Sequence, residues 1–140
     1  MNRKFFIAWI VLFVAWMAGS VVVHGVLLGP DYRQFPAMFR DEADGQRYLP
    51  VMLFAHLLVS GAFVWIYRKG LEARDWFAQG LRYGVTIALL TIVPTYLIYY
   101  AVQPMPGILV AKQIVFDGLL LLALGLVVAF LYRDAARRAS

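Results

Sequence analysis

The stretch from Gly107 to Tyr132 decides the fold, and it reads GILVAKQIVFDGLLLLALGLVVAFLY. As a helix it is long and apolar enough to cross a bilayer core of about 30 Å. Lys112, Gln113 and Asp117 interrupt the hydrocarbon. An ionisable side chain at such a depth costs about 2.5 kcal/mol or more, so it normally faces a bundle interior or a water-filled cavity. The stretch therefore predicts a membrane protein, with Asp117 as its first candidate for a site.

The composition agrees with a membrane location. Of 140 residues, 63% are apolar and 15% are charged, whereas soluble domains average about half and a quarter. The net charge is +5, but the basic residues fall in short clusters beside apolar runs. We interpret them as topology signals, and we expect no nucleic-acid partner. The absence of cysteine excludes disulfides, thiolate metal sites and thiol redox chemistry.

Four apolar runs of spanning length predict the fold class. We expect an all-α, polytopic membrane protein, a four-transmembrane-helix bundle of two antiparallel hairpins in one domain, with spans at about residues 5–28, 49–68, 80–102 and 107–132. The first run follows a basic start, as in a secretory signal. It is longer than the apolar region of about 7–15 residues in such signals, so we expect an uncleaved helix.

The first connection and the third span carry local signals. Pro36 can open a short interfacial helix with Phe35, Met38 and Phe39 on one face, although an ordinary loop fits equally well. In the third span, small residues at four-residue spacing predict close helix–helix contact, and a proline predicts a kink; these are Gly80, Gly84, Ala88 and Pro94.

Lysine and arginine counts predict the orientation. The amino end, the second connection and the tail carry nine such residues, against three in the first connection. Under the positive-inside rule, both termini lie in the cytoplasm of a multi-pass inner (plasma) membrane protein of bacterial type. Lys112 lies near the outer boundary, where its side chain can extend to the headgroups.

Polar residues recur at i, i+4 on every span and predict a polar pocket between the helices. Counting about 1.5 Å per residue places most of them in the outer half, with His24 near the outer surface. We expect Asp117 to pair with His56 or Tyr96. The full candidate set is Asp117, His56, Tyr96, Gln113, His24, Ser20, Tyr99, Thr95 and Lys112.

Each candidate also has a structural interpretation. Hydroxyl side chains can bond the i−4 carbonyl of their own helix, and tyrosines can form an interfacial belt. His24 and His56 can join helices by hydrogen bonds, or share a metal ion or a haem. The interaction of Asp117 with its neighbours can also be purely structural. The sequence implies no particular cofactor.

Three short runs carry a family resemblance. They are HGVLLGPDY, which starts at His24, GLRYG, which starts at Gly80, and VFDG, which starts at Val115. Together they resemble small four-helix bacterial inner-membrane proteins that form families of unknown function. The resemblance implies the four-span topology and no activity.

Three classes of function fit the pattern. The first is a binder or carrier whose outward pocket holds or relays a proton, cation or small amphiphile, since histidine titrates near neutrality. The second is an accessory or assembly subunit of a larger membrane complex with no ligand of its own. A membrane enzyme comes last, because the chain has no HExxH, nucleophile motif or carboxylate cluster for two metals. The expected partners are the bilayer and either a second copy or a larger complex.

Overall fold

Every regular element of the computed structural model, which describes residues 3–138, is a helix. Side chains are described through Asp134, so Arg137 and Arg138 of the predicted basic tail lie outside that part. Four helices are long and apolar enough to cross a membrane, and they cover Arg3–Leu27, Leu49–Lys69, Trp76–Val102 and Gly107–Asp134. The chain is thus a helical protein whose length and hydropathy suit a multi-pass membrane protein.

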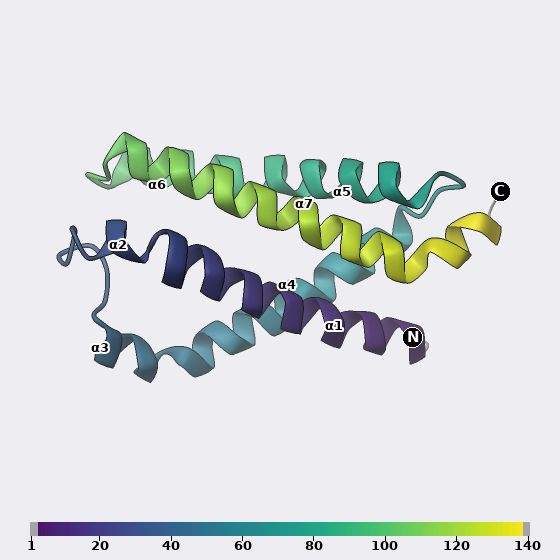
Figure 1. The fold of residues 1–140 in the computed structure, drawn as a ribbon, viewed down its shortest axis with the longest axis horizontal. Helices are drawn as coiled ribbons and strands as arrows, with labels where there is room; N and C mark the ends of the chain where they lie inside the picture. Colours follow the sequence, from purple (N-terminus) through teal and green to yellow (C-terminus); the bar gives the residue numbers. More distant parts are fainter. Residues whose placement is uncertain (1–2, 139–140) are drawn as a thin grey trace.

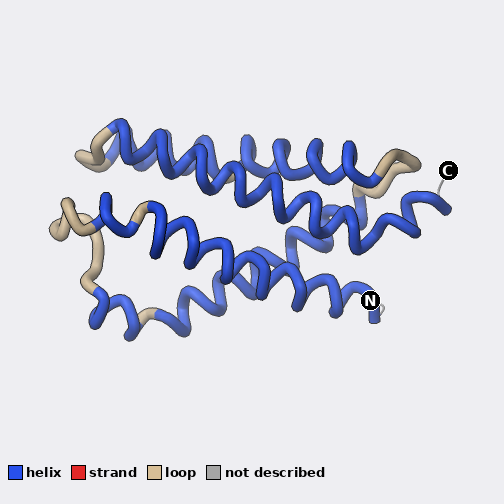
Figure 2. Tube along the Cα trace, viewed as in Figure 1, coloured by secondary structure: helices blue, strands red, loops and turns tan. Residues whose placement is uncertain are grey.

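Two of the four spans are irregular, and short helices lie between the first two. The elements in order are α1 (Arg3–Ser20), the π-helix η1 (Val21–Leu27), α2 (Gly29–Tyr32), α3 (Glu42–Arg47), α4 (Leu49–Lys69), α5 (Trp76–Leu90), α6 (Ile92–Val102) and α7 (Gly107–Arg138). The loops gather at the two ends of the molecule (Figure 2). We name the end where α1 begins and α7 ends the terminal end, and the opposite end the distal end (Figure 1).

Helix α7 is the centre of the packing. It lies along α5 and also contacts α1 and α6, while α4 packs mainly against α1 (Figure 1). The α5–α7 contact is close because glycines face each other. A Cβ on Gly84 would lie 2.8 Å from the Leu121 carbonyl oxygen, and one on Gly80 would lie 2.8 Å from the Gly125 oxygen. The predicted close approach at these glycines is confirmed.

The third span breaks where proline predicts it. Helix α5 ends at Leu90 and α6 begins at Ile92, with Thr91 between them at φ −117° and ψ −62°. Pro94 has no N–H to donate to the Leu90 carbonyl and its ring crowds that turn. The Thr91 hydroxyl donates to the Ile87 carbonyl at 2.7 Å. The break sets the direction of α6, which carries Tyr96.

Two apolar clusters hold the ends of the molecule. The larger one, at the terminal end, joins α1, α4, α5 and α7 around fully buried side chains such as Leu12, Val64, Leu121 and Val128. The smaller one, at the distal end, joins η1, α7 and the loop before α7 through Val23, Leu28, Met105, Leu109 and Val110.

Of the two alternatives for the segment at Pro36, a short helix or an ordinary loop, the structure shows the loop. Residues 33–40 form turns, and the helix begins at Glu42, where the Asp41 carboxylate accepts the Asp44 N–H at 2.8 Å. An aspartate at the N-cap satisfies one of the free N–H groups in the first turn of a helix. Phe35, Met38 and Phe39 instead pack against the distal apolar cluster.

Candidate functional site

Asp117 lies where three helical elements meet near the distal end. Only 6% of the residue is exposed. The Tyr96 hydroxyl of α6 donates to Oδ2 at 2.5 Å, and His24 Nε2 of η1 lies 3.2 Å from Oδ1. Both carboxylate oxygens therefore have a partner from another helix. The predicted pair with Tyr96 is present, whereas His56 contacts other groups and His24 takes the place expected for it.

The second ring nitrogen of His24 extends this network. Since a carboxylate only accepts, Nε2 carries hydrogen, and in the neutral ring Nδ1 then accepts from the Tyr32 hydroxyl at 2.7 Å. Burial raises the pKa of Tyr32, so this hydroxyl remains a donor at physiological pH. The Gln113 amide donates to the Tyr32 oxygen at 3.4 Å. The donors from Gln113 through Tyr32 and His24 all point toward Asp117.

The π-helix explains why His24 reaches Asp117. In a regular α-helix, Ser20 and His24 would share one face. The structure turns them to different neighbours, because the backbone changes to the wider i→i+5 pattern at Val21. The depth expected for His24 assumed α-helical rise throughout the first span, and the structure brings its ring to within 3.2 Å of the Asp117 carboxylate. Wide turns of this kind often occur at functional sites.

Ser20 and His56 form a second polar pair beside the first. His56 Nδ1 lies 2.9 Å from the Met52 carbonyl oxygen, which can only accept, so Nδ1 carries the hydrogen. In the neutral ring, Nε2 then accepts the Ser20 hydroxyl at 3.1 Å. The edge of the Trp16 ring packs on the His56 ring at a centroid distance of 6.4 Å. His56 therefore holds α1 to α4 and does not contact Asp117.

Three of the remaining candidates, Lys112, Thr95 and Tyr99, lie outside this centre. Lys112 Nζ donates to both Asp31 oxygens at 2.8 and 3.0 Å, so the lysine has a protein partner in α2 as well as a position near the distal boundary. Thr95 and Tyr99 lie on the exposed side of α6. Gln113 is buried, and its side-chain oxygen has no partner among the described residues.

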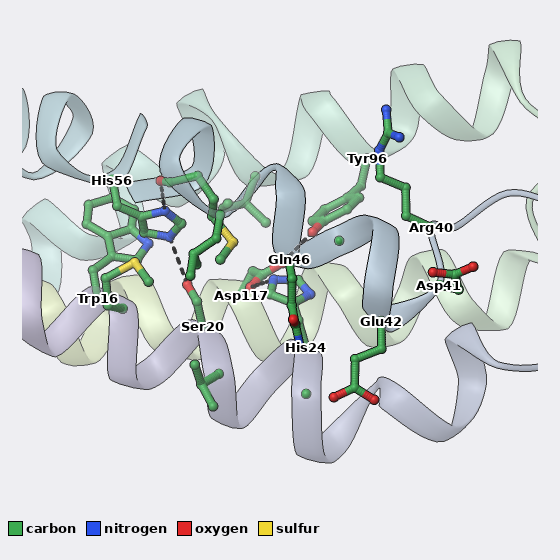
Figure 3. Close-up of a pocket in the computed structure, with 17 residues that line it drawn as sticks. Trp16, Ser20, His24, Arg40, Asp41, Glu42, Gln46, His56, Tyr96 and Asp117 are labelled. Carbon is green, nitrogen blue, oxygen red and sulfur yellow. Dashed lines mark hydrogen bonds and ion pairs between the residues drawn. The ribbon is translucent and has the colours of Figure 1, made fainter. Parts of the chain in front are cut away.

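A cavity of about 850 Å³ opens beside Asp117. Its lining comes from α1, η1, α3, α4 and α6, together with the loop before α3 and Asp117 itself. Asp117, His24 and Tyr96 meet at its inner side, Ser20 and His56 lie beside them, and Arg40, Asp41, Glu42 and Gln46 stand at its rim (Figure 3). The wall between these groups is apolar and consists of Trp16, Met17, Val21, Leu49, Met52 and Ile92. Its volume is in the range of small-molecule sites.

Metal binding was the alternative for His24 and His56. In the part of the chain that the structure describes, no group of three His, Cys, Asp or Glu side chains lies close enough together to hold a metal ion. The two histidines have separate hydrogen-bond partners on different helices.

Some residues of the site carry no pattern by which sequence alone would find them. Tyr32 and Asp31 come from the connection after the first span, and Arg40, Asp41 and Glu42 lie at the start of α3, which carries no clear signal in the sequence. The one available signal for Tyr32 is its spacing of eight residues from His24, about two helical turns, which favours one side of a helical segment.

Comparisons with known proteins return no relative. No protein-family model matches the chain, and neither a curated protein nor a solved structure is significantly similar to it.

Proposed function

We propose that the chain crosses a membrane four times as two antiparallel hairpins, with both termini in the cytoplasm and the cavity open to the opposite side. The four apolar helices and the common end of α1 and α7 support this arrangement. The excess of lysine and arginine at the terminal end supports the orientation.

Reporter fusions test the orientation. Fusions at Gly45 and Met105 are expected to report the outside, and fusions at Ala73 and Ser140 the cytoplasm. A cytoplasmic signal at Gly45 would reverse the orientation and put the cavity on the other face of the membrane.

We further propose that the cavity binds a small amphiphile with a cationic head. The observation that carries this proposal is the division of the lining into an apolar wall and an inner side that holds the Asp117 carboxylate. An amphiphile can place its tail against Trp16, Met17 and Met52 and its head near Asp117. Few correctly placed polar groups on an otherwise apolar wall are typical of small-molecule sites.

The charges of the lining favour a cation over an anion. Asp41, Glu42 and Asp117 contribute carboxylates, and Arg40 contributes the opposite charge. Arg40 donates to Asp44 at 2.5 Å, so its charge is already compensated. Trp16 and Tyr96 add aromatic surface, and aromatic faces attract ammonium groups.

Calorimetry on the protein in lipid nanodiscs tests the binding proposal. Decyltrimethylammonium is the probe, decyl sulfate is its anionic counterpart, and the heat measured with empty nanodiscs is subtracted. We expect saturable binding of the cation only. Asp117→Asn should weaken it about tenfold or more, because a hydrogen bond or ion contact to a charged group contributes about 1.5 kcal/mol or more.

Asp134→Asn is the matched control, because Asp134 is exposed and lies near the terminal end of α7. It should bind the cation like the unmodified protein. Equal binding of decyl sulfate, or an unchanged affinity in Asp117→Asn, would contradict the proposal. Absence of saturable binding together with purification as a stable hetero-complex would favour the accessory-subunit alternative.

A further inference from the structure

A second, shallower site lies on the opposite half of the molecule, on the outer surface where α1 crosses α4. An apolar groove of about 300 Å³ is lined there by Phe5, Trp9, Leu58, Gly61, Ala62 and Trp65. Its floor is low because Gly61 has no side chain and Ala62 has only a methyl group. The Trp9 ring occupies the space beside Gly61, with a ring carbon 2.8 Å from the position of a Cβ there, and its indole N–H donates to the Leu57 carbonyl at 2.7 Å.

Basic side chains stand over the aromatic lining of this groove. The Arg68 guanidinium lies 5.4 Å from the centre of the Phe5 ring, and the Lys69 ammonium lies 5.7 Å from the Trp65 ring. Phe5 and Trp65 both line the groove, and Arg68 and Lys69 end α4. The cations therefore mark its end at the membrane boundary.

These charges are not compensated by acidic side chains. Within residues 3–134, neither Arg68 nor Lys69 has a carboxylate partner. Glu72, the nearest acidic residue along the chain, bonds Arg74 and Arg82 instead, at 3.0 and 2.8 Å. The Arg82 hydrogen bond lowers the pKa of Glu72, so this carboxylate stays ionised and engaged with its own arginines.

We propose that this groove binds one anionic phospholipid, with an acyl chain along the apolar floor and the phosphate between Arg68 and Lys69. The occupant follows from two observations together. In the proposed four-span arrangement, on which this inference rests, the groove faces the hydrocarbon of the bilayer and meets acyl chains. The uncompensated cations at its end select a negative headgroup. The site does not depend on the cavity at the distal end or on its ligand.

Tryptophan quenching by brominated phospholipids tests the proposal on the full chain. In the background Trp16→Phe/Trp76→Phe, both remaining tryptophans, Trp9 and Trp65, line the groove. Vesicles contain either brominated phosphatidylglycerol or brominated phosphatidylcholine in an unbrominated phosphatidylcholine host. We expect brominated phosphatidylglycerol to reach half-maximal quenching at a lower mole fraction than brominated phosphatidylcholine. Each of the two cations should contribute about fivefold to this difference.

Two variants and two controls locate the selectivity. Arg68→Gln/Lys69→Gln should bring the two lipids to within twofold of each other, and Ala62→Phe, which fills the exposed floor, should do the same. Arg74→Gln/Arg133→Gln removes the same charge from the same end, and Ala78→Phe adds the same bulk on α5. Both controls should keep the preference for phosphatidylglycerol.

Equal quenching by the two lipids in the parent protein would overturn the proposal. An equal loss of selectivity in Arg74→Gln/Arg133→Gln would also overturn it, because general surface charge would then be the cause. If Arg68→Gln/Lys69→Gln fails to fold, as judged by circular dichroism, the single variants must each lower the preference about fivefold, and no change in either would contradict the site.

Discussion

The two ends of the molecule are built from the same four spans, yet one is closed and the other is open. At the terminal end, α1, α4, α5 and α7 share a continuous apolar cluster. At the distal end, α3 and the start of α4 stand away from η1 and α6, and a cavity of about 850 Å³ lies between them. The closed end relies on small residues that let backbones approach. The open end relies on irregular backbone and on polar side chains that bond one another.

The difference shows how a chain with four helices of membrane-spanning length can fold around a polar site. Without water to force apolar helices together, close packing depends on glycine contacts such as those of Gly80 and Gly84 with α7. The π-helix η1 and the break at Thr91 redirect His24 and Tyr96 toward Asp117. If this division is correct, changes at the closed end should affect stability, and changes at the open end should affect binding more.

The largest effect is expected at the closed end. Gly84→Leu places a Cβ 2.8 Å from backbone atoms of Leu121 and Leu122, which cannot move without separating α5 from α7. We expect a loss of about 3 kcal/mol or more, seen as low yield or a strongly reduced Tm in detergent. Gly118→Leu is the control, because a Cβ on Gly118 meets nothing within 4 Å. Similar behaviour of the two variants would mean that α5 and α7 are not in close contact.

The next effect separates structure from function at Asp117. Asp117→Leu leaves His24 Nε2 and the Tyr96 hydroxyl without their acceptor, so we expect a loss of about 2–3 kcal/mol in the free energy of unfolding. Asp117→Asn retains an acceptor for Tyr96 and should lose about 1 kcal/mol of stability, with cation binding weakened about tenfold or more. Thermal unfolding followed by circular dichroism measures the stability, with Asp134→Leu as the exposed control. A stable Asp117→Leu variant would mean that the carboxylate is not held as described.

A smaller effect is expected at Tyr32. Tyr32→Phe removes the donor to His24 Nδ1 and the acceptor for Gln113, and should cost about 1–2 kcal/mol of stability. Its ring can still pack on the Phe39 ring, whose centre lies 4.5 Å away. Tyr99→Phe, on the exposed side of α6, should leave the Tm unchanged. An unchanged Tm in Tyr32→Phe would remove the tyrosine from the network.

Structural features that depend on short, local sequence patterns could be predicted from the sequence. Spans follow from the length of apolar runs, the α5–α7 contact from the spacing of Gly80 and Gly84, and the break at Thr91 from Pro94. Asp117 could be singled out because an ionised group in hydrocarbon is costly.

Features that depend on tertiary contacts could not be predicted. Nothing in VVVHGVL distinguishes a π-helix from an α-helix, since the wider turn is stabilised by the bonds that His24 makes elsewhere in the fold. A regular α-helical count therefore gives no reason to place His24, in preference to His56, beside Asp117. The cavity rim was missed because it depends on how a loop packs, which pulls Phe35, Met38 and Phe39 onto the distal cluster.

Cysteine accessibility tests the central claim, that the distal end is an open, cation-selective cavity reaching the Asp117 network. The chain has no cysteine, so Ser20→Cys introduces a single thiol at the cavity wall, and Ala88→Cys introduces one in the closed core. In vesicles, we predict that a cationic methanethiosulfonate modifies Ser20→Cys at least about tenfold faster than an anionic one. Decyltrimethylammonium should slow this reaction, and Ala88→Cys should not react. A Ser20→Cys thiol as unreactive as that of Ala88→Cys, or one modified faster by the anionic reagent, would contradict the account.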